Sequence, residues 1–189
     1  MMFRSSQAIS VTGVAACLLS AGCFFSDPFA FVQPPPSLAP GSYSGELTIA
    51  STTKLITPEK TIVTNELVLT STFVVNVGEA GLPESARGPI AAGDQFSSII
   101  GSYRFTFDIT EVRAEENLVT IAYTVTGTFE DEDALPPLPA LELLGSGIDT
   151  YSSNGDNEVL YTRDWAVSGA VEGGRTELNM GGSGTIRRS

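Results

Sequence analysis

No histidine occurs among the 189 residues. The chain therefore lacks the side chain that most often acts as a general base near neutral pH, which is also the commonest zinc ligand. Basic residues are scarce, because ten Lys and Arg stand against 22 Asp and Glu and leave a formal net charge of −12. A phosphate backbone repels such a chain, so we exclude nucleic acid as a partner. The 42% hydrophobic content still permits one packed domain.

Familiar catalytic arrangements are missing as well. Triads and dyads built on histidine are unavailable, and no serine lies in a Gly-x-Ser-x-Gly elbow. Paired carboxylates remain a route to hydrolysis, but the strand pattern places acids such as Asp108 and Asp164 on the polar side of a sheet. We therefore predict a protein with no catalytic residues, metal or cofactor, and keep a carboxylate-dependent hydrolase as the last alternative.

Two acidic segments are candidates for calcium ligands. Calcium needs six to eight converging oxygens, whereas the consecutive carboxylates of Glu130–Asp133 would point in different directions. The segment Asn154–Glu158 lacks the spacing of an EF-hand, and Gly155 favours a turn there. Both segments are predicted to be solvated loops.

The first 22 residues have the organisation of a secretory signal peptide. Arg4 precedes an uncharged, largely apolar stretch from Ala8 to Leu19, and small residues follow. About 12 residues extend roughly 18 Å as a helix, which is too short for a hydrocarbon core of about 30 Å. Cleavage of residues 1–22 is therefore expected.

The end of this signal, Leu19-Ser20-Ala21-Gly22-Cys23, resembles the lipobox of bacterial lipoproteins, with Ser20 where that family prefers leucine. The resemblance implies that Cys23 receives a diacylglycerol and becomes the new N-terminus, with a further acyl chain such as palmitate. Cys17 would be removed, so the mature chain would hold one cysteine and no intramolecular disulfide. Phe24, rather than Asp, follows Cys23, and the family then implies sorting to the outer membrane. The expected partner is thus a membrane, reached through a lipid anchor.

Behind the anchor, a Pro-rich tether over 23–41 leads to a domain over 42–189. Pro34–Pro36 favour polyproline II, a semi-rigid spacer. Further on, apolar residues alternate with period two, which predicts an all-β fold in which an antiparallel meander closes as a small barrel or folds as a sandwich. Two connections, 78–101 and 130–157, exceed hairpin length. The predicted strands are Tyr43–Ser51, Thr61–Val77, Ser102–Val112, Leu118–Phe129, Glu158–Glu172 and Arg175–Arg187, with a weaker one at Gly147–Ser152.

Two hairpins can be aligned from sequence. In the first, a three-residue loop with Asn117 in the left-handed position sets Phe105 opposite Gly127 and Ile109 opposite Tyr123. In the second, Gly173-Gly174 is the expected turn. Its register sets Trp165 opposite Gly182, Arg163 opposite Gly184 and Tyr161 opposite Ile186.

Arg163 is unusual because it is a cation on an apolar face, between Tyr161 and Trp165. A buried guanidinium needs acceptors or an aromatic ring. One interpretation makes it the polar group of a ligand pocket, with Tyr161 and Trp165 beside the ligand and Gly182 and Gly184 leaving room. The other makes it structural, stacked on Trp165 or lying over Tyr43.

The pattern Gly41-Ser42-Tyr43 with a late-strand arginine is similar to that of lipocalins, where a Gly-x-Trp tryptophan meets an arginine, although Tyr43 replaces Trp and Arg163 precedes the final strand. The resemblance concerns architecture alone. We predict a non-catalytic binding module of the cell envelope for a small apolar ligand or a protein partner. The alternative is a structural or interaction lipoprotein with a filled core.

Overall fold

The computed structural model describes residues 37–100, 103–129, 141–155 and 157–189. Contacts divide the chain into Met1–Pro34 and Pro35–Ser189, and every described residue lies in the second unit. The signal peptide, Cys23, most of the tether and the run Glu130–Asp133 lie outside the described residues, so those predictions stay predictions. No helix among the described residues is long and apolar enough to cross a bilayer.

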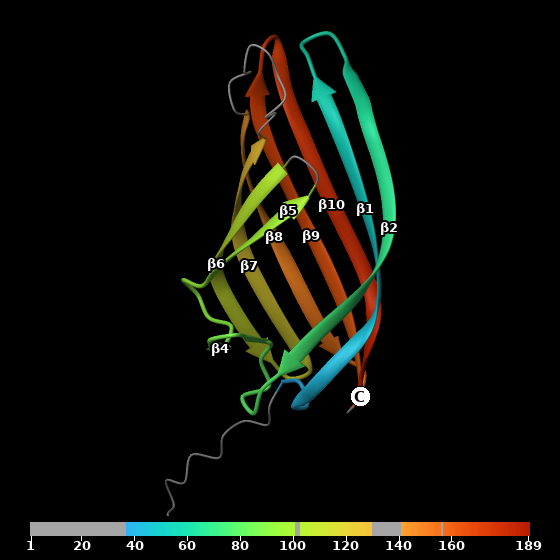
Figure 1. Ribbon diagram of the computed structural model, residues 1–189, viewed down its shortest axis with the longest axis vertical. Helices are drawn as coiled ribbons and strands as arrows, with labels where there is room; N and C mark the ends of the chain where they lie inside the picture. Colours follow the sequence, from blue (N-terminus) through green and yellow to red (C-terminus); the bar gives the residue numbers. More distant parts are fainter. Residues whose placement is uncertain (1–36, 101–102, 130–140, 156) are drawn as a thin grey trace, which may run out of the picture. The chain divides into compact units, whose positions relative to one another are not determined.

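Eight antiparallel strands form one curled sheet in the order β2-β1-β10-β9-β8-β7-β6-β5 (Figure 1). The prediction of an all-β antiparallel meander is confirmed, and the observed form is a half-barrel whose edge strands are β2 and β5. The short β3 (Glu84–Ser85) and β4 (Gly88–Pro89) form a separate ladder. The sheet strands are β1 (Gly41–Ile56), β2 (Thr61–Val77), β5 (Gln95–Ile100), β6 (Tyr103–Glu115), β7 (Leu118–Phe129), β8 (Leu141–Ser153), β9 (Glu158–Val171) and β10 (Gly174–Arg188).

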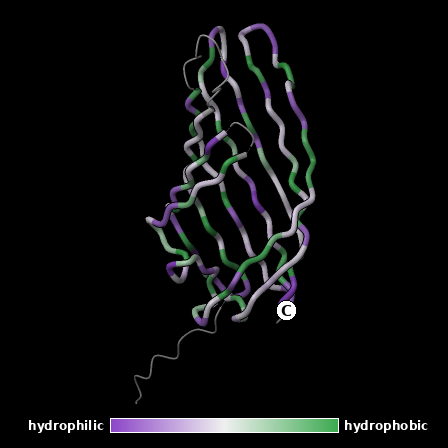
Figure 2. Tube along the Cα trace, viewed as in Figure 1, coloured by the Kyte–Doolittle hydropathy of each residue, from purple (hydrophilic) through white to green (hydrophobic). Residues whose placement is uncertain are grey.

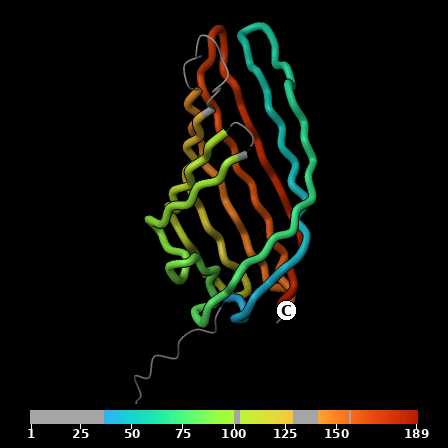
Figure 3. The backbone as a smooth tube through the Cα atoms, viewed as in Figure 1, coloured from blue at the N-terminus to red at the C-terminus, as the bar shows by residue number. Residues whose placement is uncertain are grey.

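The first and last strands are neighbours, since β1 pairs with β10 over nearly its whole length (Figure 3). The β1–β2 hairpin therefore extends the meander of β5 to β10 on its far side. Gly184 permits this close pairing, because a Cβ there would collide with the carbonyl oxygen of Glu46 in β1. The opening of the half-barrel consequently falls between β2 and β5, rather than between the chain's first and last strands.

Period-two alternation places the core on the concave face, and Figure 2 shows apolar and polar positions alternating along the strands. Phe105, Phe107 and Trp165 are almost fully buried. Phe105 lies against Trp165 in an edge-to-face arrangement with ring centroids 5.0 Å apart. Phe105 lies in β6 and Trp165 in β9, three positions away in the sheet. The curl of the sheet brings the two rings into contact. Burying each such side chain contributes about 1.5–3 kcal/mol.

The first predicted hairpin is confirmed in its central register. Phe105 pairs with Gly127 and Ile109 with Tyr123. A Cβ on Gly127 would lie 2.6 Å from the Phe105 ring, so the aromatic ring covers the glycine. Asn117 has a φ of 64°, as expected for the left-handed position. The loop differs, because Glu115 pairs with Leu118 and leaves a two-residue turn, while the bulge lies at Thr110.

The second predicted hairpin has the wrong register. Gly174 pairs with Val171, so the turn is Glu172-Gly173, and Gly173 carries the positive φ of 75°. Trp165 consequently faces Met180, Arg163 faces Gly182 and Tyr161 faces Gly184. The slip is two residues, which leaves each side chain on its predicted face.

Other strand boundaries also differ from the predictions. The weak strand Gly147–Ser152 is part of the longer β8, and the connection 78–101 contains β3, β4 and β5. Residues at the end of the predicted tether pack on the domain. Leu38 is 1% exposed, and the Tyr43 hydroxyl donates a hydrogen bond to the Ala39 carbonyl at 2.8 Å.

Candidate functional site

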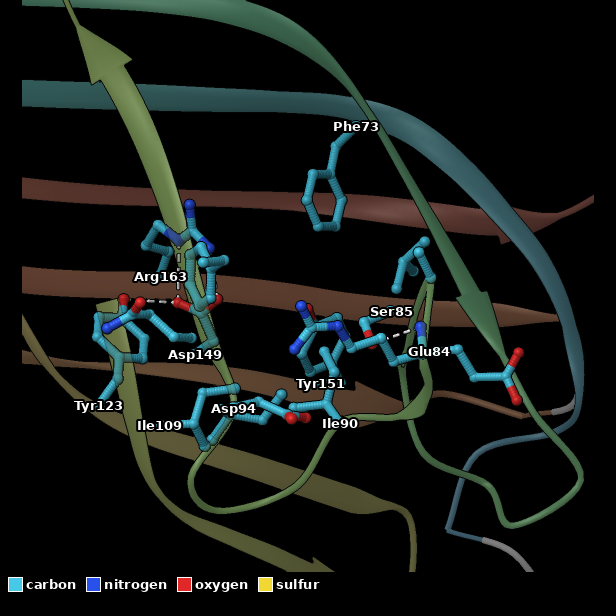
Figure 4. A pocket seen from close by; sticks show the side chains of 16 residues that line it. Phe73, Glu84, Ser85, Ile90, Asp94, Ile109, Tyr123, Asp149, Tyr151 and Arg163 are labelled. Atoms are coloured by element: carbon cyan, nitrogen blue, oxygen red, sulfur yellow. Dashed lines mark hydrogen bonds and ion pairs between the residues drawn. The ribbon is translucent and has the colours of Figure 1, made fainter. Parts of the chain in front are cut away.

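A pocket of about 410 Å³ lies at the opening of the half-barrel, between the two edge strands (Figure 4). Phe73 and Val75 of β2 line one side, and Phe96 of β5 lines the other. Inward-facing residues of β6 to β9 form the floor. Because both edge strands line it, the pocket lies at the open seam of the sheet.

The segment between β2 and β5 covers one end of the pocket with Glu84–Arg87 and Ile90. Backbone hydrogen bonds hold this segment in place, from the Ile90 amide to the Pro83 carbonyl at 2.9 Å and from the Ile109 amide to the Asp94 carbonyl at 2.9 Å. The Asp94 carboxylate also accepts a hydrogen bond from the Ala91 amide at 2.9 Å. Together with a bridge between Val77 of β2 and Pro83, these bonds attach the cover to both β2 and β6.

Asp149 of β8 is the charged side chain at the base of the pocket, and it is only 4% exposed. Its carboxylate accepts four hydrogen bonds. The Tyr123 and Tyr161 hydroxyls each donate one at 2.9 Å. The Arg163 guanidinium donates two, from Nε to Oδ1 at 2.9 Å and from Nη2 to Oδ2 at 2.6 Å. Such a paired and hydrogen-bonded carboxylate can be buried without an uncompensated charge.

Arg163 of β9 lies beside Asp149 on the neighbouring strand. Its side chain is 25% exposed, and its Cζ lies 5.9 Å from the centre of the Tyr161 ring. Burial disfavours the charged guanidinium, but the hydrogen bonds and charge of Asp149 outweigh burial and raise the pKa of Arg163. The structural partners expected for it, Trp165 and Tyr43, are not the ones observed.

Three tyrosines around this ion pair stay protonated at neutral pH. Burial is the main cause that raises the pKa of Tyr123, Tyr151 and Tyr161, and the negative charge of Asp149 raises each pKa further. Tyr151 also lines the pocket. The polar groups at the base of the pocket are thus neutral hydroxyls and a fixed ion pair, which suits hydrogen bonding to a ligand.

Aromatic rings supply much of the remaining wall. Phe73 stacks on Tyr161 with ring centroids 4.4 Å apart, and Phe96 stacks on Phe107 with centroids 4.7 Å apart. Phe96 is still 38% exposed, so part of its surface faces the opening. A ligand entering between β2 and β5 would meet these rings first.

The structure brings only one of the residues predicted for a ligand site to the pocket. Arg163 lines it, whereas Trp165 and Tyr161 are buried in the core and do not. Gly182 and Gly184 admit the backbone of β1 instead of opening a space, since a Cβ on Gly182 would lie 3.1 Å from the Thr48 carbonyl oxygen.

Sequence reasoning missed Asp149, Tyr123 and Tyr151 as members of this site. One signal was present: Asp149 lies two residues from both Gly147 and Tyr151, so it shares the inward face of the weak strand. A carboxylate on that face was the partner that Arg163 required.

Comparisons with known proteins yield no relative. No family model, no curated protein and no solved structure matches this chain. Among the described residues, no group of three or more Asp, Glu or Cys side chains is placed to hold a metal ion.

Proposed function

We propose that this protein is a lipid-anchored binding module of the cell envelope, which holds a small, largely apolar ligand in the seam pocket and does no chemistry on it. The observation that carries the proposal is the pocket itself, walled by Phe73 and Phe96 and based on the Asp149–Arg163 pair. A concave apolar site with a few fixed polar groups is the usual form of a small-molecule site. The resemblance of Leu19–Cys23 to a lipobox supports an anchor at Cys23 in the outer membrane.

The charges around the pocket favour an uncharged ligand. Arg163 and Arg87 are the cations that line it, against the carboxylates of Asp149, Glu84 and Asp94. Arg163 is already neutralised by two hydrogen bonds to Asp149. An anionic ligand would therefore enter a site with a surplus of negative charge, in a chain that is itself at −12. A neutral molecule with an apolar body and one hydrogen-bonding end fits better.

The proposal is tested by photo-crosslinking the full chain with an uncharged alkyl amide that carries a diazirine. We expect saturable labelling of the peptides that contain Phe96 and Tyr151, and weaker labelling by the matching carboxylate. Ile90→Trp adds bulk at the cover of the pocket and should reduce labelling several-fold. Ile99→Trp is the matched control, because Ile99 is 70% exposed and does not line the pocket. Equal labelling of both variants would contradict the proposal.

The anchor has its own measurement. The intact mass of the mature protein should correspond to a chain that begins at Cys23 and carries acyl chains. An unmodified mass that retains residues 1–22 would remove the lipid anchor from the proposal and leave the pocket untouched.

A second candidate function is interaction with another protein. It is favoured by the exposed apolar side chains of β2, among them Val63, Leu67 and Val68, at 49%, 43% and 69% exposure. These side chains lie outside the pocket, and both functions can belong to one molecule.

A further inference from the structure

In the distal part of the β1–β2 hairpin, both faces of β2 are exposed within the described part of the chain. We call the segment Ser51–Thr72 of this hairpin the arm. Every residue from Thr61 to Thr72 is exposed. Leu67 and Leu69 lie on the concave side, opposite Ser51 and Ile49, and are 43% and 50% exposed, while Val68 on the convex side is 69% exposed. Burial of these apolar side chains against a partner would therefore stabilise the arm.

The arm also carries a free sheet edge. Strand β2 pairs with β1 on one side, and on the other side the only described pairing is a single bridge from Val77 to Pro83. Native proteins usually protect such an edge with lysine, proline or a bulge. β2 contains no lysine and no proline, and its one irregularity lies at Thr64, opposite Thr53 and Lys54. The segment from Asn65 to Ser71 is regular and unprotected.

We propose that β2 of one molecule pairs antiparallel with β2 of a second copy, centred on Val68. A two-fold axis perpendicular to the sheet pairs residues of the same face, which restricts the register to whole two-residue steps. With Val68 opposite Val68, Leu67 of each copy faces Leu69 of the other, and Glu66 faces Thr70. A shift of one step toward Leu67 would set Val68 opposite Glu66. The centre at Val68 is thus the register that matches apolar residues with each other.

Charge permits this pairing although the protein is strongly acidic. Glu66 is the single charged residue in the 17 residues of β2, and in the proposed register it faces a threonine. The negative charge of the molecule therefore lies elsewhere. Pairing through one identical edge on both copies also closes the assembly as a dimer, whereas pairing of β2 with β5 would continue as a fibre.

Cysteine cross-linking tests the register. Directly opposed residues in an antiparallel pair have Cα atoms about 4.5–5.5 Å apart, which is within reach of a disulfide. Val68→Cys in the full chain should therefore form a disulfide with its copy on mild oxidation. Val74→Cys is the matched control, because Val74 is 59% exposed on the same strand, and two copies would lie about 40 Å apart at 3.3 Å per residue. Trypsin releases both positions in one peptide, Thr61–Arg87, which contains no native cysteine.

A charge pair tests the same register without cysteine. Thr70→Lys places a lysine opposite Glu66 of the partner at two symmetric positions, and Thr70→Glu places a carboxylate there. Because opposed charges across strands attract and like charges repel, we expect the dimer dissociation constant to differ at least about tenfold between these two variants, with the lysine variant tighter. Both substitutions fall on an exposed position, so the circular dichroism of the sheet should not change.

The outcomes separate cleanly. Cross-linking at Val68 without cross-linking at Val74, together with the expected order of the Thr70 variants, supports the dimer. A monomer at all concentrations, equal cross-linking at both positions, or head-to-tail polymers would overturn it. None of these results depends on the pocket or on its ligand.

Discussion

The aromatic core and the arm are built from the same kind of strand and differ in what faces them. Val125 in β7 is 1% exposed, whereas Val63 in β2 is 49% exposed, although both belong to apolar, β-branched stretches of one sheet. In the core, the curl brings Phe105 and Phe107 of β6 over Trp165 of β9, with ring centroids 5.0 and 5.8 Å apart. No such contact is made by the arm within the described part of the chain.

The comparison shows that alternation sets the face on which an apolar side chain lies, and that curvature of the sheet decides whether this face is covered. Strands three positions apart would be about 14 Å apart in a flat sheet, from a spacing of about 4.8 Å. Side chains can cross that distance only where the sheet bends. The pocket lies at the limit of this bend, at the edges β2 and β5. Asp149 at its base is the only buried charged side chain among the described residues.

The largest effect is expected from breaking the ion pair of the core. Asp149→Ala leaves the Arg163 guanidinium without its partner and two tyrosine hydroxyls without their acceptor. Removing one member of a buried pair typically costs about 3–5 kcal/mol of the free energy of unfolding. Denaturant unfolding of the full chain measures this loss.

The control for this variant is another aspartate of the same sheet. Asp164 is exposed on the convex face, so Asp164→Ala should change the free energy of unfolding by no more than about 0.5 kcal/mol. Adding Arg163→Met to Asp149→Ala should recover part of the loss, since no unpaired charge is then buried. Equal losses for Asp149→Ala and Asp164→Ala would show that the pair does not hold the core.

The face on which each side chain lies was predictable, because side chains alternate with period two. An error of two residues in the register therefore leaves every side chain on the same face. The second hairpin was placed two residues out of register, yet Arg163, Trp165 and Val167 kept their inward side. The two glycines at 173 and 174 gave no local preference between the two turns. In the first hairpin, Asn117 in the left-handed position fixed the turn, and the paired residues around Phe105 followed.

Beyond Arg163, the lining of the pocket was not predictable, because it depends on the curl and on β8. Gly145, Gly147 and Ser146 gave β8 little strand character, so Asp149 was not recognised as the partner of Arg163. Without that strand, the glycines Gly182 and Gly184 were interpreted as space for a ligand. In the fold they let β1 approach β10, an arrangement of the first and last strands that alternation alone does not reveal.

Alkaline pH should destabilise the core selectively. Burial raises the pKa of Tyr123, Tyr151 and Tyr161 in the folded state, while the unfolded chain has the ordinary tyrosine pKa of about 10. Below about pH 10 these tyrosines are protonated in both the folded and the unfolded state, so they do not make the free energy of unfolding depend on pH. Above this pH the unfolded state loses protons first, so stability falls by up to about 1.4 kcal/mol per pH unit for each tyrosine.

The arm contains no tyrosine, so this pH effect arises outside the arm. The denaturant midpoint and the tyrosinate absorbance should be measured at a series of pH values above about 10. We expect the fall in the midpoint and the rise in absorbance at the same pH. Burial also raises the pKa of Tyr103, so Tyr161→Phe should reduce the slope by about one quarter if the four tyrosines are equivalent. Tyrosinate that appears near pH 10 without loss of stability would mean that the rings are not held in the core.

The smallest effect is expected when a valine is replaced by alanine, once in the core and once in the arm. Val125→Ala removes two buried methyl groups beneath the aromatic rings and should cost about 2 kcal/mol of the free energy of unfolding, from about 0.8 kcal/mol per group and the cavity left behind. Val63→Ala makes the same change in the arm, where half of the side chain is already in water, and should cost less than about 0.5 kcal/mol. Because the residue type and the strand type are shared, the difference reports only what covers each position. Similar costs in dilute solution would mean that the arm is covered after all, and a cost at Val63 that grows with protein concentration would identify a second copy as its cover.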